Sequence, residues 1–164
     1  MDCLVRVNFK NVWRNKALFI GSYEHTIDVK GRMAVPSRFR DRLGERMYVT
    51  RWLDKCLALF PADQFEELAA KVSSLSIGDP NARNLRRIFF SEAAEVAPDK
   101  QGRINIPARL RQFAGVSADD AQVAVVGMNN FVEIWAMETW NSVQEEAEQN
   151  VDTMAAALAH IGAI

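Results

Sequence analysis

The sequence has few of the residues on which enzyme and metal chemistry usually depends. Only two histidines occur among its 164 residues, His25 and His160, and they lie far apart in the chain. The two cysteines, Cys3 and Cys56, show no metal-ligand spacing, and we expect free thiols. No Gly-rich phosphate loop, HExxH pattern or Ser-His-Asp set is recognisable. The sequence therefore predicts no catalytic residue, no metal and no cofactor.

Long apolar runs are also missing. No stretch approaches the roughly 18 consecutive apolar residues that a membrane-spanning helix requires. Charged residues interrupt the first 20 positions, "MDCLVRVNFKNVWRNKALFI", so they form no apolar signal core. We therefore expect a cytoplasmic protein without membrane contact. What is present is a hydrophobic fraction of 49%, which is sufficient for a packed globular core.

Net charge is close to zero, at −1, but the charges are unevenly distributed along the chain. Residues 30–46 carry a net charge of +4, whereas residues 138–152 carry −5 and no basic residue. This separation is typical of a protein that binds a polyanion on one face. Two ordinary solvated helix faces would give the same pattern, so charge alone leaves both interpretations open.

The most informative feature is a repeated segment. The stretch "DVKGRMAVPSRFRDRLG" at residues 28–44 matches "DKQGRINIPARLRQFAG" at residues 99–115. In each copy, apolar and polar residues alternate on both sides of an Asp-x-x-Gly turn, and a proline then ends the second strand. The pattern predicts a β-hairpin followed by a helix of one to two turns, which ends at Gly44 or Gly115.

The turns themselves have a structural requirement for two residue types. An aspartate at the first turn position accepts backbone N–H bonds, and a glycine at the fourth supplies a positive φ. We therefore assign structural roles in the turns to Asp28, Gly31, Asp99 and Gly102. The arginine that follows each turn has two possible roles, since it could pair only with the turn carboxylate or instead contact an external anion.

Each copy continues with a second hairpin and a helix, "YVTRWLDKCLALFPADQFEEL" and "VAVVGMNNFVEIWAMETWNSV". A unit this small buries little apolar surface alone. We therefore expect a β-rich α+β fold in which two tandem repeats share one pseudo-two-fold, barrel-like core with flanking helices. The predicted segments are an N-terminal extension (1–18), a first repeat (19–78), and a second repeat with a linking helix and a C-terminal helix (79–164).

The ends of the second segment carry their own local patterns. Asp79 and Pro80 are typical of the start of a helix. From Met137 to Ile161 we expect one longer helix, in which Met154, Leu158 and Ile161 recur at helical spacing. These residues predict a packing face for this subunit or a neighbouring one.

Together these motifs closely resemble the MraZ family, a tandem branch of the SpoVT-AbrB (swapped-hairpin) DNA-binding class. The resemblance covers residues 19 to 145 and includes both Asp-x-x-x-Arg turns and the tryptophan-bearing end of the second repeat. It implies interlocked hairpins, ring-shaped homo-oligomers and nucleoid association. It also implies transcription regulation through short direct repeats of double-stranded DNA upstream of a division and cell-wall gene cluster. Residues 1–18 precede the part that resembles the family.

The resemblance also implies which residues bind DNA: the arginine and the exposed tip of each turn, and the arginines after each proline. The expected set is Lys30, Arg32, Arg38, Arg40, Lys100, Gln101, Arg103, Arg109 and Arg111. One hypothesis from another class stays open, namely an antitoxin-like or scaffold protein whose arginines neutralise an acidic protein partner. Sequence-selective, salt-sensitive binding to duplex DNA would distinguish the two.

Overall fold

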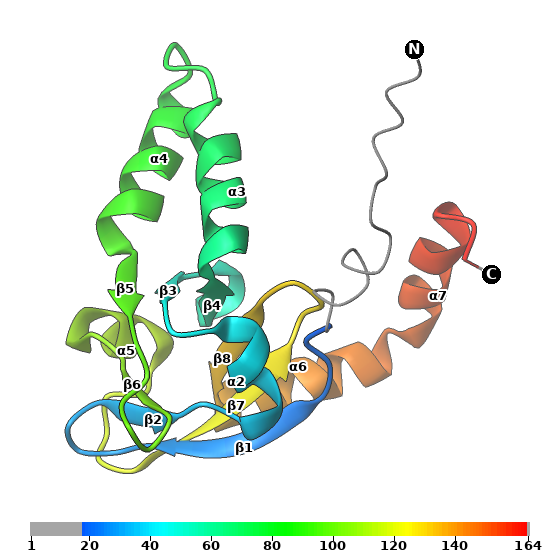
Figure 1. The fold of residues 1–164 in the computed structure, drawn as a ribbon. Helices are drawn as coiled ribbons and strands as arrows, with labels where there is room; N and C mark the ends of the chain where they lie inside the picture. Colours follow the sequence, from blue (N-terminus) through cyan, green and yellow to red (C-terminus); the bar gives the residue numbers. More distant parts are fainter. Residues whose placement is uncertain (1–17, 164) are drawn as a thin grey trace, which may run out of the picture.

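A single antiparallel sheet of eight strands, wrapped by six α-helices, makes up the part of the chain that the computed structural model describes, residues 18–163 (Figure 1). The first repeat contains β1 (Ser22–Ile27), β2 (Arg32–Ala34), α2 (Ser37–Leu43), β3 (Met47–Arg51), the short 3-10 helix η1 (Leu53–Lys55), β4 (Leu57–Pro61) and α3 (Ala62–Ser73). The second contains α4 (Pro80–Glu92), β5 (Ala94–Val96), β6 (Arg103–Asn105), α5 (Ala108–Ala114), β7 (Ala121–Gly127), β8 (Val132–Ala136), α6 (Met137–Gln149) and α7 (Val151–His160).

The strand order β5-β3-β4-β8-β7-β1-β2-β6 interleaves the two repeats. Four of the seven pairings, β3 with β5, β4 with β8, β1 with β7 and β2 with β6, join strands of different repeats. The two end strands, β5 and β6, are consecutive in the chain and are linked by one short turn. The sheet therefore curls into a nearly closed barrel, and the predicted β-rich α+β fold with a shared core is confirmed.

Equivalent residues of the two repeats meet inside this barrel. Met33 and Ile104 occupy matching strand positions and are both fully buried. Phe39 of α2 and Leu110 of α5, which face inward from the helices after the prolines, are 2% and 1% exposed. Burying side chains of this size contributes roughly 1.5–3 kcal/mol each. Because the two repeats line one core, each half depends on the other for this stabilisation.

The short helices begin and end close to the predicted residues. The N-terminal boundary residues of α2 and α5 are Pro36 and Pro107, and their C-terminal boundary residues are Gly44 and Gly115. Gly115 adopts the left-handed conformation, whereas Gly44 combines a φ of +76° with a ψ of −162° and lies outside it.

The helix that links the repeats starts as predicted. The Asp79 carboxylate accepts a bond from the backbone N–H of Asn81 at 2.9 Å, and Pro80 opens α4. The helices α3 and α4 lie side by side and project from the barrel as a hairpin (Figure 1).

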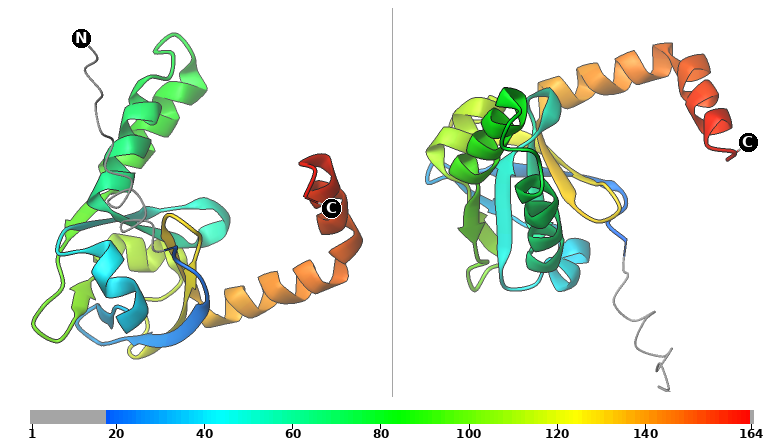
Figure 2. Two further views of the ribbon diagram at one scale, coloured as in Figure 1. Left: turned by 45° about the vertical axis from the view of Figure 1, so that its right-hand side comes forward. Right: turned by 90° about the horizontal axis from the view of Figure 1, so that it is seen from above.

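The prediction of one continuous C-terminal helix is wrong, because α6 and α7 are separated at Asn150. This residue has φ −114° and ψ 31°, and its side-chain amide donates to the carbonyl of Glu146 at 2.8 Å. Asparagine competes in this way with the backbone bonds that would continue a helix. Trp140 and Val143 pack α6 against the barrel, whereas the chain beyond them extends away from it (Figure 2).

Candidate nucleic-acid interface

The first turn is organised around the carboxylate of Asp28. Its Oδ1 accepts bonds from the backbone N–H groups of Lys30 (3.0 Å) and Arg32 (2.9 Å). Its Oδ2 accepts from Nε of Arg32 at 2.8 Å and forms an ion pair with Nη2 of the same guanidinium at 2.8 Å. The aspartate therefore shapes the turn and fixes the arginine side chain at the same time.

The second turn repeats this arrangement. Asp99 Oδ1 accepts from the backbone N–H groups of Gln101 and Arg103, both at 2.9 Å. Its Oδ2 lies 2.8 Å from both Nε and Nη2 of Arg103. Both turns therefore have the same hydrogen-bond geometry, with an aspartate carboxylate at the centre of each.

These bonds also determine how the aspartates ionise. The side-chain hydrogen bond from Arg32, followed by the backbone bond from the same residue, lowers the pKa of Asp28 to about 2. At Asp99 the backbone bond from Arg103 is the largest cause and lowers the pKa of that carboxyl below its ordinary value. Both carboxylates stay charged at neutral pH, and each keeps its arginine oriented.

Backbone bonds tie the two turns together. The carbonyl of Gly31 accepts from the N–H of Ile106, and the carbonyl of Gly102 accepts from the N–H of Val35, both at 2.9 Å. Between them β2 and β6 pair antiparallel, with Arg32 opposite Asn105 and Ala34 opposite Arg103. Residues in diagonal positions on one sheet face lie about 7–8 Å apart, so Arg32 and Arg103 are close neighbours on the outer face of this ribbon.

Arg40 and Arg111 each lie against the turn of the opposite repeat, an arrangement that the sequence did not reveal. Nε of Arg40 donates to the carbonyl of Val35 and Nε of Arg111 donates to that of Ile106, both at 2.9 Å. A Cβ added to Gly102 would come within 2.7 Å of the Arg40 guanidinium carbon. The equivalent distance from Gly31 to Arg111 is 2.8 Å. Each of these two arginines therefore packs against the turn of the other repeat and helps hold it in place.

Arg38 and Arg109 occupy matching helix positions but have different surroundings. Both side chains are exposed. Within residues 18–163, Arg38 forms no ion pair or side-chain hydrogen bond. Nη2 of Arg109, by contrast, lies 2.9 Å from Oε1 of Glu92. The carboxylate of Glu92 is buried at the end of α4 and also lies 4.0 Å from Nη1 of Arg51. The sequence analysis missed Glu92, because nothing local indicates that the end of α4 reaches α5.

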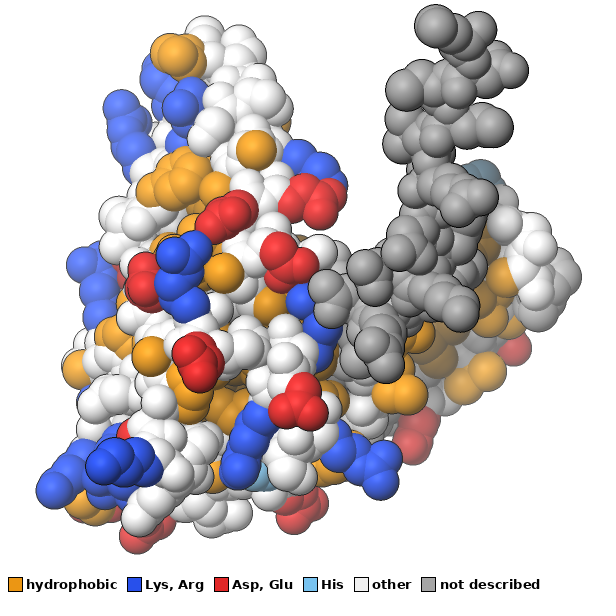
Figure 3. Space-filling view, viewed as in Figure 1, with side chains coloured by type: hydrophobic (Ala, Val, Ile, Leu, Met, Phe, Trp, Pro, Cys, Tyr) orange, Lys and Arg blue, Asp and Glu red, His pale blue; other side chains and the backbone are white. Residues whose placement is uncertain are grey.

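Eight of the nine expected DNA-binding residues are Lys or Arg, and they lie on the two hairpin turns and on the helices α2 and α5 beside them. Lys30, Lys100 and Gln101 are exposed at the turn tips. Figure 3 shows basic side chains gathered at the lower left of the molecule, where Figure 1 places the β1–β2 turn. The structure thus brings together the residues that the sequence placed 71 positions apart.

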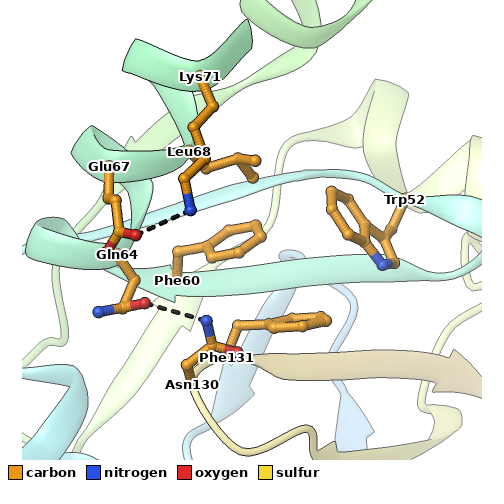
Figure 4. A pocket seen from close by; sticks show the side chains of 8 residues that line it. All are labelled: Trp52, Phe60, Gln64, Glu67, Leu68, Lys71, Asn130 and Phe131. Atoms are coloured by element: carbon orange, nitrogen blue, oxygen red, sulfur yellow. Dashed lines mark hydrogen bonds and ion pairs between the residues drawn. The ribbon is translucent and has the colours of Figure 1, made fainter. Parts of the chain in front are cut away.

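Away from the turns, the described chain contains a hollow lined by aromatic and aliphatic side chains. Among residues 18–163 there is no group of three or more His, Cys, Asp or Glu side chains that could hold a metal ion. A hollow of about 210 Å³ between α3 and the β7–β8 turn is lined largely by Trp52, Phe60, Leu68 and Phe131 (Figure 4). Its polar groups are occupied by one another, since Asn130 donates to Gln64 at 3.0 Å and Lys71 pairs with Glu67 at 2.9 Å. In the same part of the chain, no helix is long and apolar enough to cross a membrane.

Two interleaved hairpin repeats with paired Asp-x-x-Gly-Arg turns define a tandem swapped-hairpin protein. The family model described as MraZ protein, antitoxin-like, matches the chain twice, at residues 18–88 and 89–160. The chain therefore belongs to the MraZ family, as the resemblance predicted.

Two curated relatives are similar to this chain over nearly the whole of their own length. The protein named "Transcriptional regulator MraZ" of Roseiflexus sp. (strain RS-1) is 47% identical over 144 residues, which are 88% of this chain and 99% of that protein. The protein of the same name from Roseiflexus castenholzii (strain DSM 13941 / HLO8) is 46% identical over 144 residues, with the same coverage. The predicted N-terminal extension, residues 1–18, lies almost entirely outside the described residues.

Proposed function

We propose that this protein is a transcriptional regulator, without enzymatic activity, that binds double-stranded DNA sequence-specifically through its two turns. Membership of the MraZ family and the names of the two relatives support regulation of transcription. The observation that carries DNA binding is the pairing of two identically held arginines, Arg32 and Arg103, on one face. Short direct repeats in a promoter are the proposed target, and the nucleoid is the proposed place of action.

The geometry of each turn arginine suits base reading. The aspartate occupies Nε and Nη2, and within the described residues Nη1 of Arg32 and of Arg103 has no hydrogen-bond partner. A guanidinium held in this way loses little conformational entropy when it binds, and its free N–H groups can donate to a guanine edge or a phosphate. B-DNA's major groove admits a two-stranded ribbon, which is the form in which β2 and β6 present the two arginines.

The surrounding basic residues supply the part of the affinity that does not depend on sequence. Lys30 and Lys100 at the tips, and Arg38 and Arg109 on the adjacent helices, are exposed and able to contact phosphates. In this proposal Arg40 and Arg111 act mainly by holding the opposite turn in place. Several such subunits, joined in a ring-shaped homo-oligomer, would contact several repeats at once.

The test replaces the two turn arginines. We expect Arg32→Ala and Arg103→Ala each to weaken binding to operator DNA by about 1–3 kcal/mol, since each removes one base-edge contact. Arg32→Lys should retain much of the affinity but lose the preference for operator over scrambled duplex, because lysine lacks the planar fork. Fluorescence anisotropy on matched and scrambled duplexes measures both quantities.

Arg46→Ala is the matched control. It removes the same charge from an exposed arginine that pairs with Glu66, away from the turns. It should leave affinity and selectivity close to wild type, and thermal melts should show that all variants fold. Unchanged operator affinity in the Arg32→Ala/Arg103→Ala double variant would refute the assignment. Equal binding of all duplexes, together with a tight acidic protein partner, would favour the protein-interaction alternative.

A further inference from the structure

The C-terminal arm, defined here as Glu145–Ile161, is an amphipathic segment without a partner in its own subunit. Along α7 and the residue after it, the side chains of Val151, Met154, Leu158 and Ile161 follow helical spacing on one side and are 45–74% exposed. Among its described residues α7 has no buried side chain. An isolated helix of this length is only marginally stable in water, so a surface that covers its apolar stripe would stabilise it.

The arm also specifies the charge of that surface. Glu145, Glu146, Glu148 and Asp152 are all exposed, and His160 is the arm's one basic-type side chain. A partner surface should therefore combine arginines or lysines with exposed apolar groups.

Such a surface exists on α4, the outer helix of the projecting α3–α4 hairpin. Arg83, Arg86 and Arg87 line an open hollow together with Ile77, which is 68% exposed. Phe90 lies on the same side of the helix and is 43% exposed. We call these five residues the basic face. Figure 3 shows basic side chains on the left flank of this hairpin and apolar side chains along the arm.

The arm and the basic face do not meet within one subunit. The α3–α4 hairpin and the α6–α7 arm project from different parts of the barrel in every view (Figures 1 and 2). Two arms pairing with each other would bring like charges together, which is unfavourable. From these observations we infer that the acidic arm of one copy binds the basic face of a second copy, head to tail. The inference rests on the homo-oligomer in the proposed function and names the surfaces that build it.

A head-to-tail contact has a particular symmetry. Each subunit uses one arm and one basic face, so each copy still offers one free surface after it binds a neighbour. Repetition of the contact gives a closed ring if the rotation between neighbours closes, and an open filament if it does not. The inferred interface is therefore compatible with the proposed ring.

Two variants and two matched controls test the interface in the full-length protein. Leu158→Asp places a charge in the apolar stripe of the arm, whereas Thr153→Asp places the same charge on the other side of α7. Arg86→Glu/Arg87→Glu reverses charge on the basic face, whereas Lys71→Glu reverses charge on α3 of the same hairpin, where Lys71 pairs with Glu67. Sedimentation velocity measures mass, and circular dichroism with thermal melts checks folding.

We expect wild type and both controls to form oligomers, and both interface variants to sediment as much smaller species. Mixing the two interface variants should give a one-to-one dimer and nothing larger. One partner supplies the only intact arm and the other the only intact basic face, so the assembly stops at two.

Three outcomes would overturn the inference: a monomeric wild type, a basic-face variant that assembles normally, or a mixture that stays monomeric. The variants should still bind a duplex with a single repeat as the wild-type subunit does. In an oligomeric wild type, a failed interface with intact single-repeat binding would therefore count against this inference alone. A monomeric wild type would also remove the ring from the proposed function, but not DNA binding through the turns.

Discussion

Gly31 is subject to two constraints at once. Its φ of +82° disfavours any residue with a Cβ, and a Cβ there would also lie 2.8 Å from the Arg111 guanidinium carbon. Gly115 shares the positive φ, +71°. In the described chain, however, no heavy atom lies within 4 Å of where its Cβ would be, other than those of Gly115 itself and its two chain neighbours. Comparing the two positions separates backbone strain from the loss of the contact between repeats.

We expect Gly115→Ala to lower the free energy of unfolding by about 1–2 kcal/mol through strain alone. Gly31→Ala should cost about 1 kcal/mol more, because Arg111 must leave the carbonyl of Ile106. In an Arg111→Ala background this excess should vanish, since the two changes share one contact. Urea denaturation measures the wild type and the four variants, namely Gly115→Ala, Gly31→Ala, Arg111→Ala and Gly31→Ala/Arg111→Ala. Equal losses at the two glycines would show that the arginine contact contributes nothing.

The sequence predicted the contacts within each turn, but not the contacts that hold the turns against the opposite repeat. Asp28 bonds only to atoms within four residues of itself, and the positive φ of Gly31 belongs to the same turn, so the spacing of residue types was enough to assign their turn roles. The contacts of Arg40 with the opposite turn, and of Glu92 with Arg109, depend on how the repeats interlock. No pattern within one segment encodes such contacts.

At the scale of the elements, strand pairing between the repeats is the dominant feature. The β1–β2, β3–β4 and β7–β8 hairpins, the short helices after the prolines and the start of α4 follow from turn and capping residues, and the sequence predicted them. The hairpin expected around Asp99 is only partly formed, because β5 and β6 flank its turn but pair with β3 and β2 instead of with each other. The break between α6 and α7 was missed because one asparagine outweighs an otherwise helical pattern. The sequence did not determine the strand order either. Alternating apolar and polar residues indicate that a strand forms, but not which strand it pairs with.

We expect either half of the chain, residues 19–78 or 79–164, to be unfolded or to self-associate when expressed alone. Separation removes four of the seven strand pairings and leaves apolar strand faces and edges open. Circular dichroism and a two-dimensional NMR spectrum of each half measure this, and mixing the halves should restore the native spectrum. A monomeric half with a well-dispersed spectrum would contradict the shared core.

At the scale of the whole molecule, one subunit presents a single pair of turns, and the overall charge of −1 adds little general attraction to DNA. We expect affinity to rise by roughly 10²–10⁴ when a duplex carries two or three operator repeats instead of one, because later contacts become intramolecular. Shifting the spacing between repeats by half a helical turn should abolish most of the gain.

Titrations with one-, two- and three-repeat duplexes measure this rise, and light scattering gives the mass of the protein used. Leu158→Asp is the informative control, since it should bind one repeat normally but gain little from the others. If wild-type protein binds one repeat as tightly as three, avidity plays no part in operator recognition.

The interleaved strand order also affects how the protein is made. The partner of β1 is β7, which begins at Ala121, and the partner of β4 is β8, which ends at Ala136. At a synthesis rate of about 5–20 residues per second, translation of residues 60–136 takes roughly 4–15 s. Only then are both partner strands in the second repeat complete. During that interval the unpaired edges of β1 and β4, and the apolar side chains of β4, are exposed to other nascent chains. We therefore expect slower translation through residues 60–136 to raise the fraction of the protein that aggregates instead of folding.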